Sequence, residues 1–375
     1  MKILFMTSRD ITHPKWAGGD VYHFEVARRL ARKGHIVAML CSKYPKSKNC
    51  EEIEGIKIIR IKGGVFRILS NFITYSKALK GKYNVVIEEA EGPSGPLFAF
   101  LYAKEPVVIM WHQLGKTIYS NQFPYLIALT LLALERLYVA LARKYQIMVP
   151  SQERAKEFLT VGVSKDNINV VPAAFSIQPS KKKNNGSPRE PYFLILGKIR
   201  RYKAYHHAID ALKILDQNAR CLLIIAGRRG EDRYYAELNN LIAEYGLQNR
   251  VYVKLNISEE EKRQLLSNAV ALIVTSPIEG FSIVSAEANA LGIPVIATDG
   301  VPEEVIKDRF NGLKYKFGDV KALAEKMDKL MIDEKLREEL SKNAIKNVSK
   351  FSWDRSARLF EETLEKTVKK DLSNW

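Results

Sequence analysis

The chain has 375 residues, of which 46% are apolar and 27% are charged. At roughly 100–200 residues per domain this length predicts two domains, and the composition excludes a largely disordered chain. Lys and Arg outnumber Asp and Glu by 59 to 42, a net charge of +17 that favours negatively charged partners. Cys41, Cys50 and Cys221 form no Cys-x-x-Cys pair, so we expect a reduced intracellular protein without a disulfide framework or cysteine-bound zinc.

The signals for membrane targeting are weak. The apolar run that follows Met1-Lys2 is too short for a secretory signal. The longest apolar stretch, residues 123–142, is interrupted by Glu135 and Arg136, each of which costs about 2.5–3.5 kcal/mol at a bilayer centre. We therefore expect no integral membrane span.

Short apolar runs alternate with helical patterns in the first half of the chain. In chain order we predict strand 2–7, helix 20–33, strands 36–42 and 57–61, helix 68–80, strand 84–88, helix 96–102, strand 107–111, helix 124–144 and strand 146–149. Continuous apolar strands separated by amphipathic helices are typical of a parallel sheet that is covered on both faces.

Residues 176–191 interrupt this pattern with three prolines, a lysine triplet and Asn-Asn-Gly, which predicts a linker or a surface loop. The alternation then restarts: strand 192–196, helix 203–215, strand 221–226, helix 233–245, strand 250–253, helix 259–267, strand 270–274, helix 283–291 and strand 294–297, followed by helices 320–331, 334–348 and 353–369. The pattern predicts an α/β protein of two doubly wound domains.

The turn after strand 270–274 carries the most informative residues. Ligands in such sheets bind beyond the carboxyl ends of strands, where the next helix begins. The free N–H groups near Ser282 at the start of helix 283–291 are suited to a diphosphate, and Gly280 permits a close approach. Glu287 can accept hydrogen bonds from ribose hydroxyls, and Glu279 would face the group attached to the diphosphate. On spacing alone, both acids are explained equally well as a solvated turn residue and a favourable acid near a helix start.

Lysines in the turn after strand 192–196 support a site for an anion. Lys198 and Lys203 can neutralise phosphate charge without a metal, whereas Arg200 and Arg201 fit an exposed basic loop. The six histidines show no metal-ligand spacing and no Asp-x-Asp pair occurs, so metal-independent chemistry is favoured. His112 follows strand 107–111, where a lone histidine is more often structural.

Residues 279–287 (EGFSIVSAE) resemble the Glu-x7-Glu motif of retaining, nucleotide-sugar-dependent glycosyltransferases of family 4, which have the two-domain GT-B fold. The resemblance extends in order over nearly the whole chain, through residues 18–35, 149–151, 168–172, 288–297 and 351–353. It implies two Rossmann-like doubly wound parallel-sheet domains that face each other across a cleft. Residues 1–175 would form the acceptor domain, 176–191 a linker and 192–352 the donor domain, with the C-terminal helix, about 353–375, packing back on the first domain.

The resemblance also assigns roles to residues. Glu279 and His112 would be catalytic and lie near the donor sugar. The other matching positions would bind the donor, with Glu287 at the ribose and the lysines at the phosphates: Gly18, Gly19, Lys198, Lys203, Gly280, Phe281, Ser282, Ile283 and Glu287. Lys198 stands where the family usually has arginine and Ser282 where glycine is more common. No metal site is implied.

The expected activity is transfer of a sugar, such as a hexose, from a UDP- or GDP-sugar to a glycan, lipid-linked or small-molecule acceptor, with retention and without a metal or other cofactor. We expect a cytoplasmic enzyme of cell-envelope glycan biosynthesis. Helix 123–144 is explained as a helix buried against the sheet or as an interfacial helix that docks on the cytoplasmic face of an anionic membrane. Two alternatives remain: a basic nucleic-acid-binding α/β protein, although no nucleic-acid module is present, or another GT-B enzyme such as a sugar-phosphate-utilising synthase.

Overall fold

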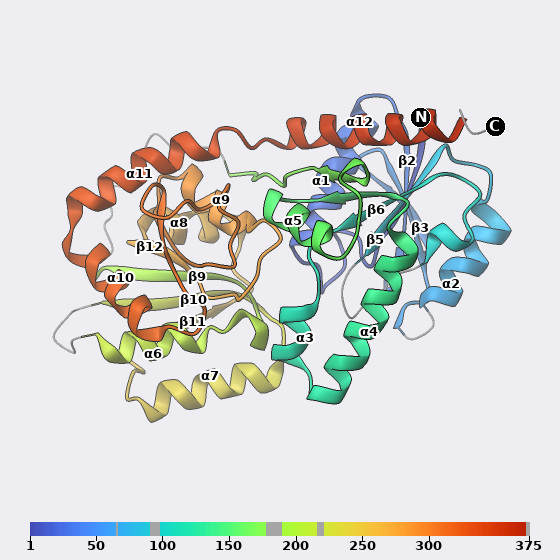
Figure 1. Cartoon of the computed structure of the whole chain (residues 1–375). Coiled ribbons are helices and arrows are strands. Elements are labelled where there is room, and N and C mark those ends of the chain that lie inside the picture. Colours follow the sequence, from blue (N-terminus) through green and yellow to red (C-terminus); the bar gives the residue numbers. More distant parts are fainter. Residues whose placement is uncertain (65–66, 91–97, 178–189, 216–220, 373–375) are drawn as a thin grey trace. The chain divides into compact units, whose positions relative to one another are not determined.

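The computed structural model describes residues 1–64, 67–90, 98–177, 190–215 and 221–372. The chain divides into two compact units, each built on one sheet (Figure 1). Unit 1 comprises Met1–Tyr119, Phe123–Ala174 and Phe351–Trp375, and unit 2 comprises Ser120–Gln122 and Phe175–Lys350. Most of the predicted linker 176–191 and the start of the predicted helix 96–102 lie outside the described residues.

Unit 1 contains an eight-stranded sheet, here called sheet A, with the order β3-β4-β2-β1-β5-β6-β7-β8. Its strands are β1 (Lys2–Met6), β2 (Ile36–Ser42), β3 (Cys50–Ile53), β4 (Ile56–Ile61), β5 (Val85–Ala90), β6 (Val107–Trp111), β7 (Gln146–Val149) and β8 (Ile168–Val170). All neighbours pair in parallel except β3 with β4. Because the chain builds outward from β1 in one direction and then returns with β5 on its other side, the topological switch point lies between β1 and β5.

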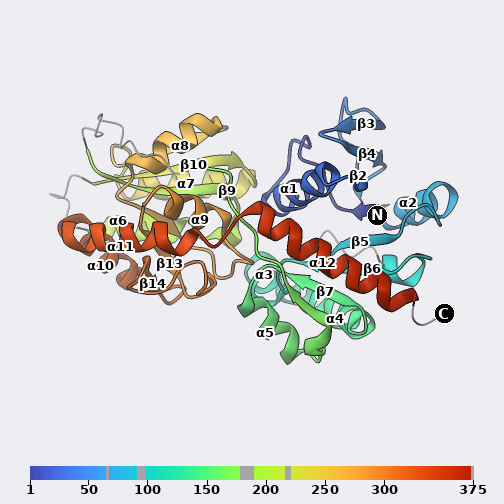
Figure 2. The same ribbon diagram turned by 90° about the horizontal axis from the view of Figure 1, so that it is seen from above.

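Helices cover both faces of sheet A. One face packs against the helical turns η2 (Tyr75–Leu79) and η4 (Ala99–Leu101) and against α4 (Tyr125–Ala142) and α5 (Gln152–Thr160). The chain enters η2 from α2 (Arg67–Thr74), and α3 (Lys116–Gln122) follows β6. The other face carries α1 (Gly18–Arg32), on which α12 (Trp353–Leu372) packs (Figures 1 and 2). Two ion pairs link this part of the chain to α12. Arg29 Nε of α1 lies 2.7 Å from Asp354 Oδ1, and Lys33 Nζ, just after α1, lies 2.5 Å from Glu361 Oε2.

Unit 2 contains a six-stranded, wholly parallel sheet, sheet B, with the order β11-β10-β9-β12-β13-β14. Its strands are β9 (Tyr192–Ile199), β10 (Leu222–Arg229), β11 (Val251–Leu255), β12 (Ala271–Val274), β13 (Val295–Thr298) and β14 (Gly312–Tyr315). Its helices are α6 (His206–Ile214), α7 (Asp232–Glu244), α8 (Glu259–Asn268), α9 (Ile283–Ala290), α10 (Val320–Ile332) and α11 (Glu334–Val348). The switch point of this sheet lies between β9 and β12.

Among the described residues, five β-strands and α-helices were not predicted. They are β3, β8, β14, α3 and α5. The exposed and half-buried residues of β3 give it no apolar run, because an edge strand beside a single partner buries little. An apolar pattern thus misses elements whose residues form no continuous apolar run.

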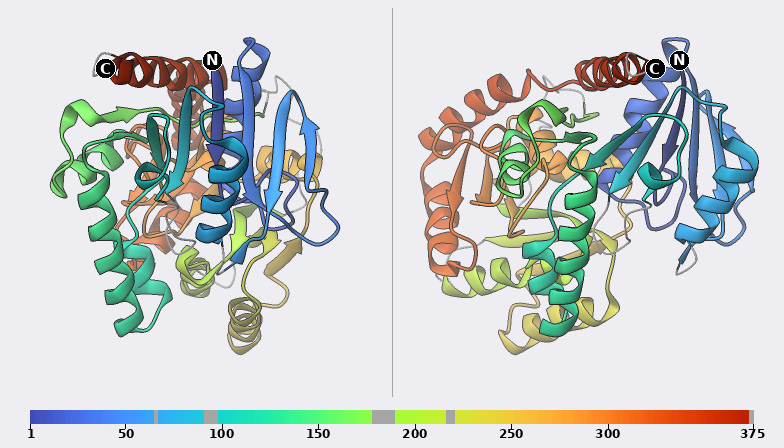
Figure 3. Two further views of the ribbon diagram at one scale, coloured as in Figure 1. Left: turned by 90° about the vertical axis from the view of Figure 1, so that its right-hand side faces the viewer. Right: turned by 45° about the vertical axis from the view of Figure 1, so that its right-hand side comes forward.

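Helix α4 is only partly explained as a helix buried against the sheet. Within it Ala128, Tyr138, Val139 and Ala142 are buried, and the last three belong to the unit 1 core. Most of its other apolar side chains are exposed, including Leu126 at 76% exposure, whereas Leu131 and Leu132 are half-buried. Over its 18 residues the mean hydropathy is 1.7 and 22% of the residues are buried, so by length and composition α4 resembles a spanning helix although it packs on sheet A (Figure 3).

Candidate functional site

The carboxyl edge of sheet B, at its switch point, brings together the two turns that the sequence singled out. β9 extends beyond the predicted strand 192–196, so Lys198 lies within its last residues and not in the turn, whereas Lys203 lies in the turn that follows β9 and residues 275–282 follow β12. Two glycines let adjacent strands approach there: a Cβ on Gly227 would lie 2.0 Å from the carbonyl oxygen of Gly197. Both glycines have positive φ, 147° for Gly197 and 146° for Gly227, so a larger residue would separate the strand ends.

Lys203 and Glu279 form the central ion pair of this edge. Lys203 Nζ donates to Glu279 Oε1 at 2.5 Å, and the two side chains are 21% and 15% exposed. Burial alone would lower the pKa of the Lys203 ammonium, but the Glu279 carboxylate outweighs burial and raises it. The backbone supports the pair, because the Thr275 hydroxyl donates to the Lys203 carbonyl oxygen at 2.5 Å, which ties the turn after β9 to the turn after β12.

Helix α9 begins beside this pair. Ile283 and Val284 are half-buried, and the first N–H groups of a helix have no partner within it. Ser282, the residue before the helix, has φ 76° and ψ 72°, a left-handed conformation that favours glycine. Its hydroxyl shares a hydrogen bond of 2.7 Å with that of Ser285, which compensates part of the strain.

Glu287 lies one turn into α9 and is buried, with 7% of its side chain exposed. Lys262 of α8 donates to Glu287 Oε1 at 2.9 Å and also contacts Glu259 at 2.7 Å. Burial raises the pKa of Glu287, and Lys262 opposes that effect. Lys262 therefore fixes the Glu287 carboxylate, a hydrogen-bond acceptor, near the start of α9.

The remaining predicted residues of unit 2 surround this centre. Lys198 is half-buried and stands opposite Arg228 of β10 in the strand register. Arg201 is exposed and pairs with Glu237, as expected for a basic surface loop. Gly280 is half-buried, whereas Phe281 is buried.

At the carboxyl edge of sheet A, two consecutive acids of β5 point in opposite directions, as strand geometry requires. Glu88 accepts from the Ala99 N–H and the Tyr138 hydroxyl, both at 2.7 Å. Glu89 faces the other side, where its Oε2 accepts from the Ser8 N–H at 2.7 Å. This hydrogen bond crosses the switch point between β1 and β5.

Two histidines converge on the second oxygen of Glu89. His23 Nε2 of α1 lies 3.2 Å from Glu89 Oε1, and the two side chains are 0% and 1% exposed. His112 Nε2, just after β6, lies 3.9 Å from the same oxygen and its side chain is 21% exposed. The facing atoms of all three groups lie within 4.8 Å of one another. The fold thus joins residues whose sequence spacing gave no sign of a cluster.

The electrostatics of this His23–Glu89–His112 cluster favour an ionised carboxylate beside a neutral imidazole. Burial would raise the pKa of Glu89, but His23, His112 and the Ser8 N–H outweigh burial and lower it. Burial and the neighbouring His23 lower the pKa of His112 to about 4, against the opposing effect of Glu89. His112 is therefore neutral at pH 7.

Gly19 lies against the same cluster. A Cβ at this position would lie 3.0 Å from His112 Nε2 and 3.4 Å from Glu89 Oε1. The Gly18-Gly19 pair begins α1, so the absence of a side chain lets the start of the helix pack against the imidazole.

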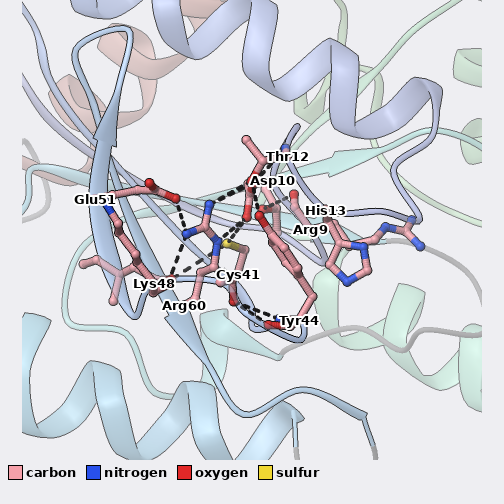
Figure 4. A network of polar contacts seen from close by, with 12 residues as sticks. Arg9, Asp10, Thr12, His13, Cys41, Tyr44, Lys48, Glu51 and Arg60 are labelled. Atoms are coloured by element: carbon pink, nitrogen blue, oxygen red, sulfur yellow. Dashed lines mark hydrogen bonds and ion pairs between the residues drawn. The ribbon is translucent and has the colours of Figure 1, made fainter.

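A buried network fixes the loop between β1 and α1 (Figure 4). Asp10 and Arg60 are joined from Nε to Oδ2 at 2.7 Å, with both side chains fully buried. Arg60 Nη2 also donates to the Thr12 hydroxyl at 2.9 Å, and the Cys41 thiol donates to Asp10 at 3.3 Å. Burial would raise the pKa of Asp10, but Arg60 and Thr12 lower it. The loop beside the switch point is therefore held by charge as well as by packing.

The places of Glu89 and His23 in this cluster and of Lys262 beside Glu287 were not predicted from the sequence. The pair Glu88-Glu89 at the end of an apolar run was a usable signal, because an acid there must either leave the strand or find a buried partner. Lys262 carried no signal, since its partner Glu287 lies 25 residues further along the chain.

The chain matches two family models. One, described as glycosyl transferases group 1, matches residues 176–347, and the other, glycosyltransferase family 4, matches residues 16–178. Together they extend from residue 16 to residue 347.

Two curated relatives with glycosyltransferase names agree with these matches. The chain is 26% identical over 240 residues to a D-inositol 3-phosphate glycosyltransferase of Xylanimonas cellulosilytica, which covers 60% of this chain and 57% of the relative. It is 24% identical to the N,N'-diacetylbacillosaminyl-diphospho-undecaprenol alpha-1,3-N-acetylgalactosaminyltransferase of Campylobacter jejuni, over 94% of this chain and 97% of that one.

Solved structures show the same fold. Sucrose-phosphate synthase from Thermosynechococcus elongatus matches with a TM-score of 0.81 and 22% identity, over 97% of this chain and 98% of that one. The Anabaena protein HepE, solved with UDP and glucose, matches with a TM-score of 0.78 and 20% identity, over 98% of this chain and all of that one. The fold is GT-B, and the chain belongs to the group 1, family 4 glycosyltransferases.

Proposed function

We propose that this glycosyltransferase moves a sugar, such as a hexose, from a nucleotide-sugar donor to an acceptor hydroxyl with retention of configuration and without a divalent cation. The observation that carries the proposal is the Lys203–Glu279 pair beside the start of α9 at the switch point of sheet B. A cation and unpaired helix N–H groups suit a diphosphate. The HepE structures with UDP and UDP-glucose support a UDP-sugar among the possible donors.

In this proposal the diphosphate lies on the N–H groups of Ile283 and Val284, with Lys198 and Lys203 beside it. Glu287 accepts hydrogen bonds from the ribose hydroxyls, and its pairing with Lys262 at 2.9 Å holds it for that task. When the diphosphate binds Lys203, the Glu279 carboxylate shares its cation and becomes available to the donor sugar.

The proposed reaction breaks the bond between the anomeric carbon and the diphosphate oxygen. Lys198, Lys203 and the helix start stabilise the negative charge that develops on the leaving group. The acceptor oxygen bonds to the anomeric carbon on the face that the leaving group vacates, and its proton passes to the departing phosphate oxygen. We assign His112, Gly18 and Gly19 to the donor-sugar side of the reaction, where a neutral imidazole exchanges hydrogen bonds with sugar hydroxyls.

We further propose that the acceptor is lipid-linked and that the enzyme works in the cytoplasm, peripherally on the membrane, in cell-envelope glycan biosynthesis. The exposed apolar side chains of α4 support this view, and exposed Lys116, Arg136, Arg143 and Lys144 lie on or beside that helix. Such a surface fits anionic lipid headgroups. The name of the Campylobacter relative refers to a diphospho-undecaprenol acceptor.

Vesicle flotation tests the membrane part. We expect the chain to float with vesicles that contain anionic lipid, and the variant Leu126→Asp with Leu134→Asp to stay in the soluble fraction. Absence of binding to anionic vesicles at low salt would contradict membrane docking without affecting the donor site.

The donor site is tested by a thermal-shift panel of nucleoside diphosphates and their sugars. A ligand at a hundredfold excess over its dissociation constant stabilises the fold by about 2.7 kcal/mol. We expect one UDP- or GDP-sugar to raise Tm and to be consumed with release of its nucleoside diphosphate, at an equal rate in EDTA. Glu279→Gln should keep the fold and lose most transfer; full activity of this variant would remove Glu279 from the mechanism.

A sugar-phosphate-utilising synthase is the second candidate, favoured by the 0.81 TM-score to sucrose-phosphate synthase. An acceptor panel that includes sugar phosphates separates it from a lipid-linked or glycan transferase. The nucleic-acid-binding alternative would require salt-sensitive binding to duplex or single strands, which we do not expect.

A further inference from the structure

The buried pair His23 and Glu89 has no role in the reaction as proposed so far. Its side chains are 0% and 1% exposed, with His23 Nε2 3.2 Å from Glu89 Oε1, and His23 Nδ1 has no hydrogen-bond partner in the described part of the chain. Buried polar groups are costly unless they are paired. The cluster contains one side chain from α1, one from β5 and one from the residue after β6. A buried polar cluster built from three parts of the chain calls for a functional explanation.

We propose that Glu89 and His23 are positioning residues, a carboxylate–imidazole pair that orients the His112 ring at the carboxyl edge of sheet A with its hydrogen on Nε2. The inference rests on the proposed function, in which His112 contacts the donor sugar.

The geometry around the carboxylate supports this assignment. Glu89 Oε2 is anchored by the Ser8 N–H at 2.7 Å, so the carboxylate is fixed to β1 as well as to its own strand. Its Oε1 faces His23 Nε2 at 3.2 Å and His112 Nε2 at 3.9 Å. An anion at these distances favours the tautomer whose N–H dipole points toward it. The Nδ1 lone pair of His112, on the other side of the ring, is then available to accept from a hydroxyl.

Packing limits the ring from two further sides. The Tyr22 ring lies edge-on at 5.7 Å between centroids, and the His23 ring lies at 5.4 Å. Gly19 closes the third side, because even a Cβ there would reach 3.0 Å from His112 Nε2. Rotation of the imidazole away from Glu89 would therefore displace several buried groups.

A bound metal ion is the competing explanation for two histidines and one carboxylate. Tetrahedral zinc holds its ligands at about 2.0–2.1 Å, which places neighbouring ligand atoms roughly 3.4 Å apart. The His23–Glu89 distance of 3.2 Å is close to that value, whereas His112 Nε2 lies 3.9 Å from the same oxygen, farther than a regular tetrahedral site places its ligands. The distances therefore do not match a regular tetrahedral zinc site.

The test compares Glu89→Gln and His23→Phe with a matched control, Glu105→Gln. Glu105 is also buried and accepts from the Gly81 N–H at 2.7 Å, but it contacts Tyr75 instead of a histidine. We expect the first two variants to lower kcat by about 10–100-fold, as supporting residues of this kind do. Donor KM should stay unchanged, and the control should keep wild-type kcat. His23→Gln, which restores an N–H donor, should recover part of the rate.

A nitrogen-15 NMR spectrum of the histidine rings supplies a readout that a purely structural role would not move. We expect hydrogen on Nε2 of His112 in the wild type and a mixture of tautomers in Glu89→Gln. Wild-type kcat in Glu89→Gln, an unchanged tautomer, or one equivalent of zinc in the purified protein would overturn the inference. Full activity of His112→Ala would instead refute the proposed role of His112, so the two failures are distinguishable.

Discussion

The carboxyl edges of the two sheets share a topology but differ in how they hold charge. At the edge of sheet B, Lys203 and Glu279 pair while 21% and 15% of their side chains remain exposed. At the edge of sheet A, His23 and Glu89 are buried at 0% and 1%. A partly open ion pair can exchange its partner for an incoming anion, whereas a buried pair keeps its partner and fixes geometry. In the proposed function, this difference assigns the neutralisation of a leaving group to unit 2 and the orientation of the reacting sugar to unit 1.

The largest effect is expected from removing the cation of sheet B. Lys203→Met should lower kcat/KM for the donor by about 10²–10³-fold, because a preorganised charge that meets the leaving group is lost. Initial rates of nucleoside diphosphate release measure this effect. Lys316→Met, which removes an exposed lysine of the same unit, should have no effect. Equal rates for the two variants would contradict a specific role of Lys203 at the edge of sheet B.

Gly19→Ala sharpens the comparison from the other edge. The new methyl group would lie 3.0 Å from His112 Nε2, and the displaced ring should cost about 10-fold in kcat, as small misplacements of catalytic groups do. Stability should change little, because the preference of a helix for alanine over glycine, about 0.5–1 kcal/mol, opposes the cost of moving the packed ring. Kinetics and Tm of the same variant give both values. A loss of Tm would show that the glycine is needed for folding instead.

A pH effect is expected where Glu135 supports the loop that follows His112. Glu135 of α4 accepts from the Gly115 N–H at 2.7 Å. Burial raises its pKa from 4.5 to about 7, although the Gly115 N–H and the Tyr119 hydroxyl oppose the rise. The folded chain therefore holds a proton that the unfolded chain loses, and stability falls as pH rises through this range.

Glu135→Gln should remove that dependence, because an amide keeps the hydrogen bond and does not ionise. Its Tm should exceed that of the wild type at pH 8, and the difference should shrink at pH 5. Glu52→Gln, at an exposed position of unit 1, serves as the control for the change in net charge. Parallel Tm curves for Glu135→Gln and the wild type would show that Glu135 ionises normally.

The smallest effect concerns Ser282, whose φ of 76° is unfavourable for a residue with a Cβ. Alanine at this position keeps the backbone strain that its Cβ causes and loses the hydrogen bond to Ser285. Glycine also loses the hydrogen bond but relieves the strain. We expect Ser282→Gly to be more stable than Ser282→Ala by about 1 kcal/mol. Urea unfolding of the two variants measures their relative stability. A higher stability of Ser282→Ala than of Ser282→Gly would mean that residue 282 does not keep its left-handed conformation.

The sequence predicted the edge of sheet B better than that of sheet A for a physical reason. Residues 279–287 lie on one turn and the helix that follows it, so their proximity is local and visible in a motif. The cluster of sheet A joins positions 23, 89 and 112, which come together only through the strand order. Strands with continuous apolar runs were likewise predictable, whereas charged residues interrupt such a run in β3 (CEEI) and β14 (GLKY).

The central claim is that the edge of sheet B, and not that of sheet A, binds the nucleoside diphosphate. Calorimetric titration of UDP and GDP into the wild type, Lys203→Met and Glu89→Gln tests it directly. The account predicts that Lys203→Met weakens binding by at least about 10-fold, the loss of one charge-assisted contact, while Glu89→Gln binds as the wild type does. Unchanged affinity in Lys203→Met, or a greater loss in Glu89→Gln, would contradict it.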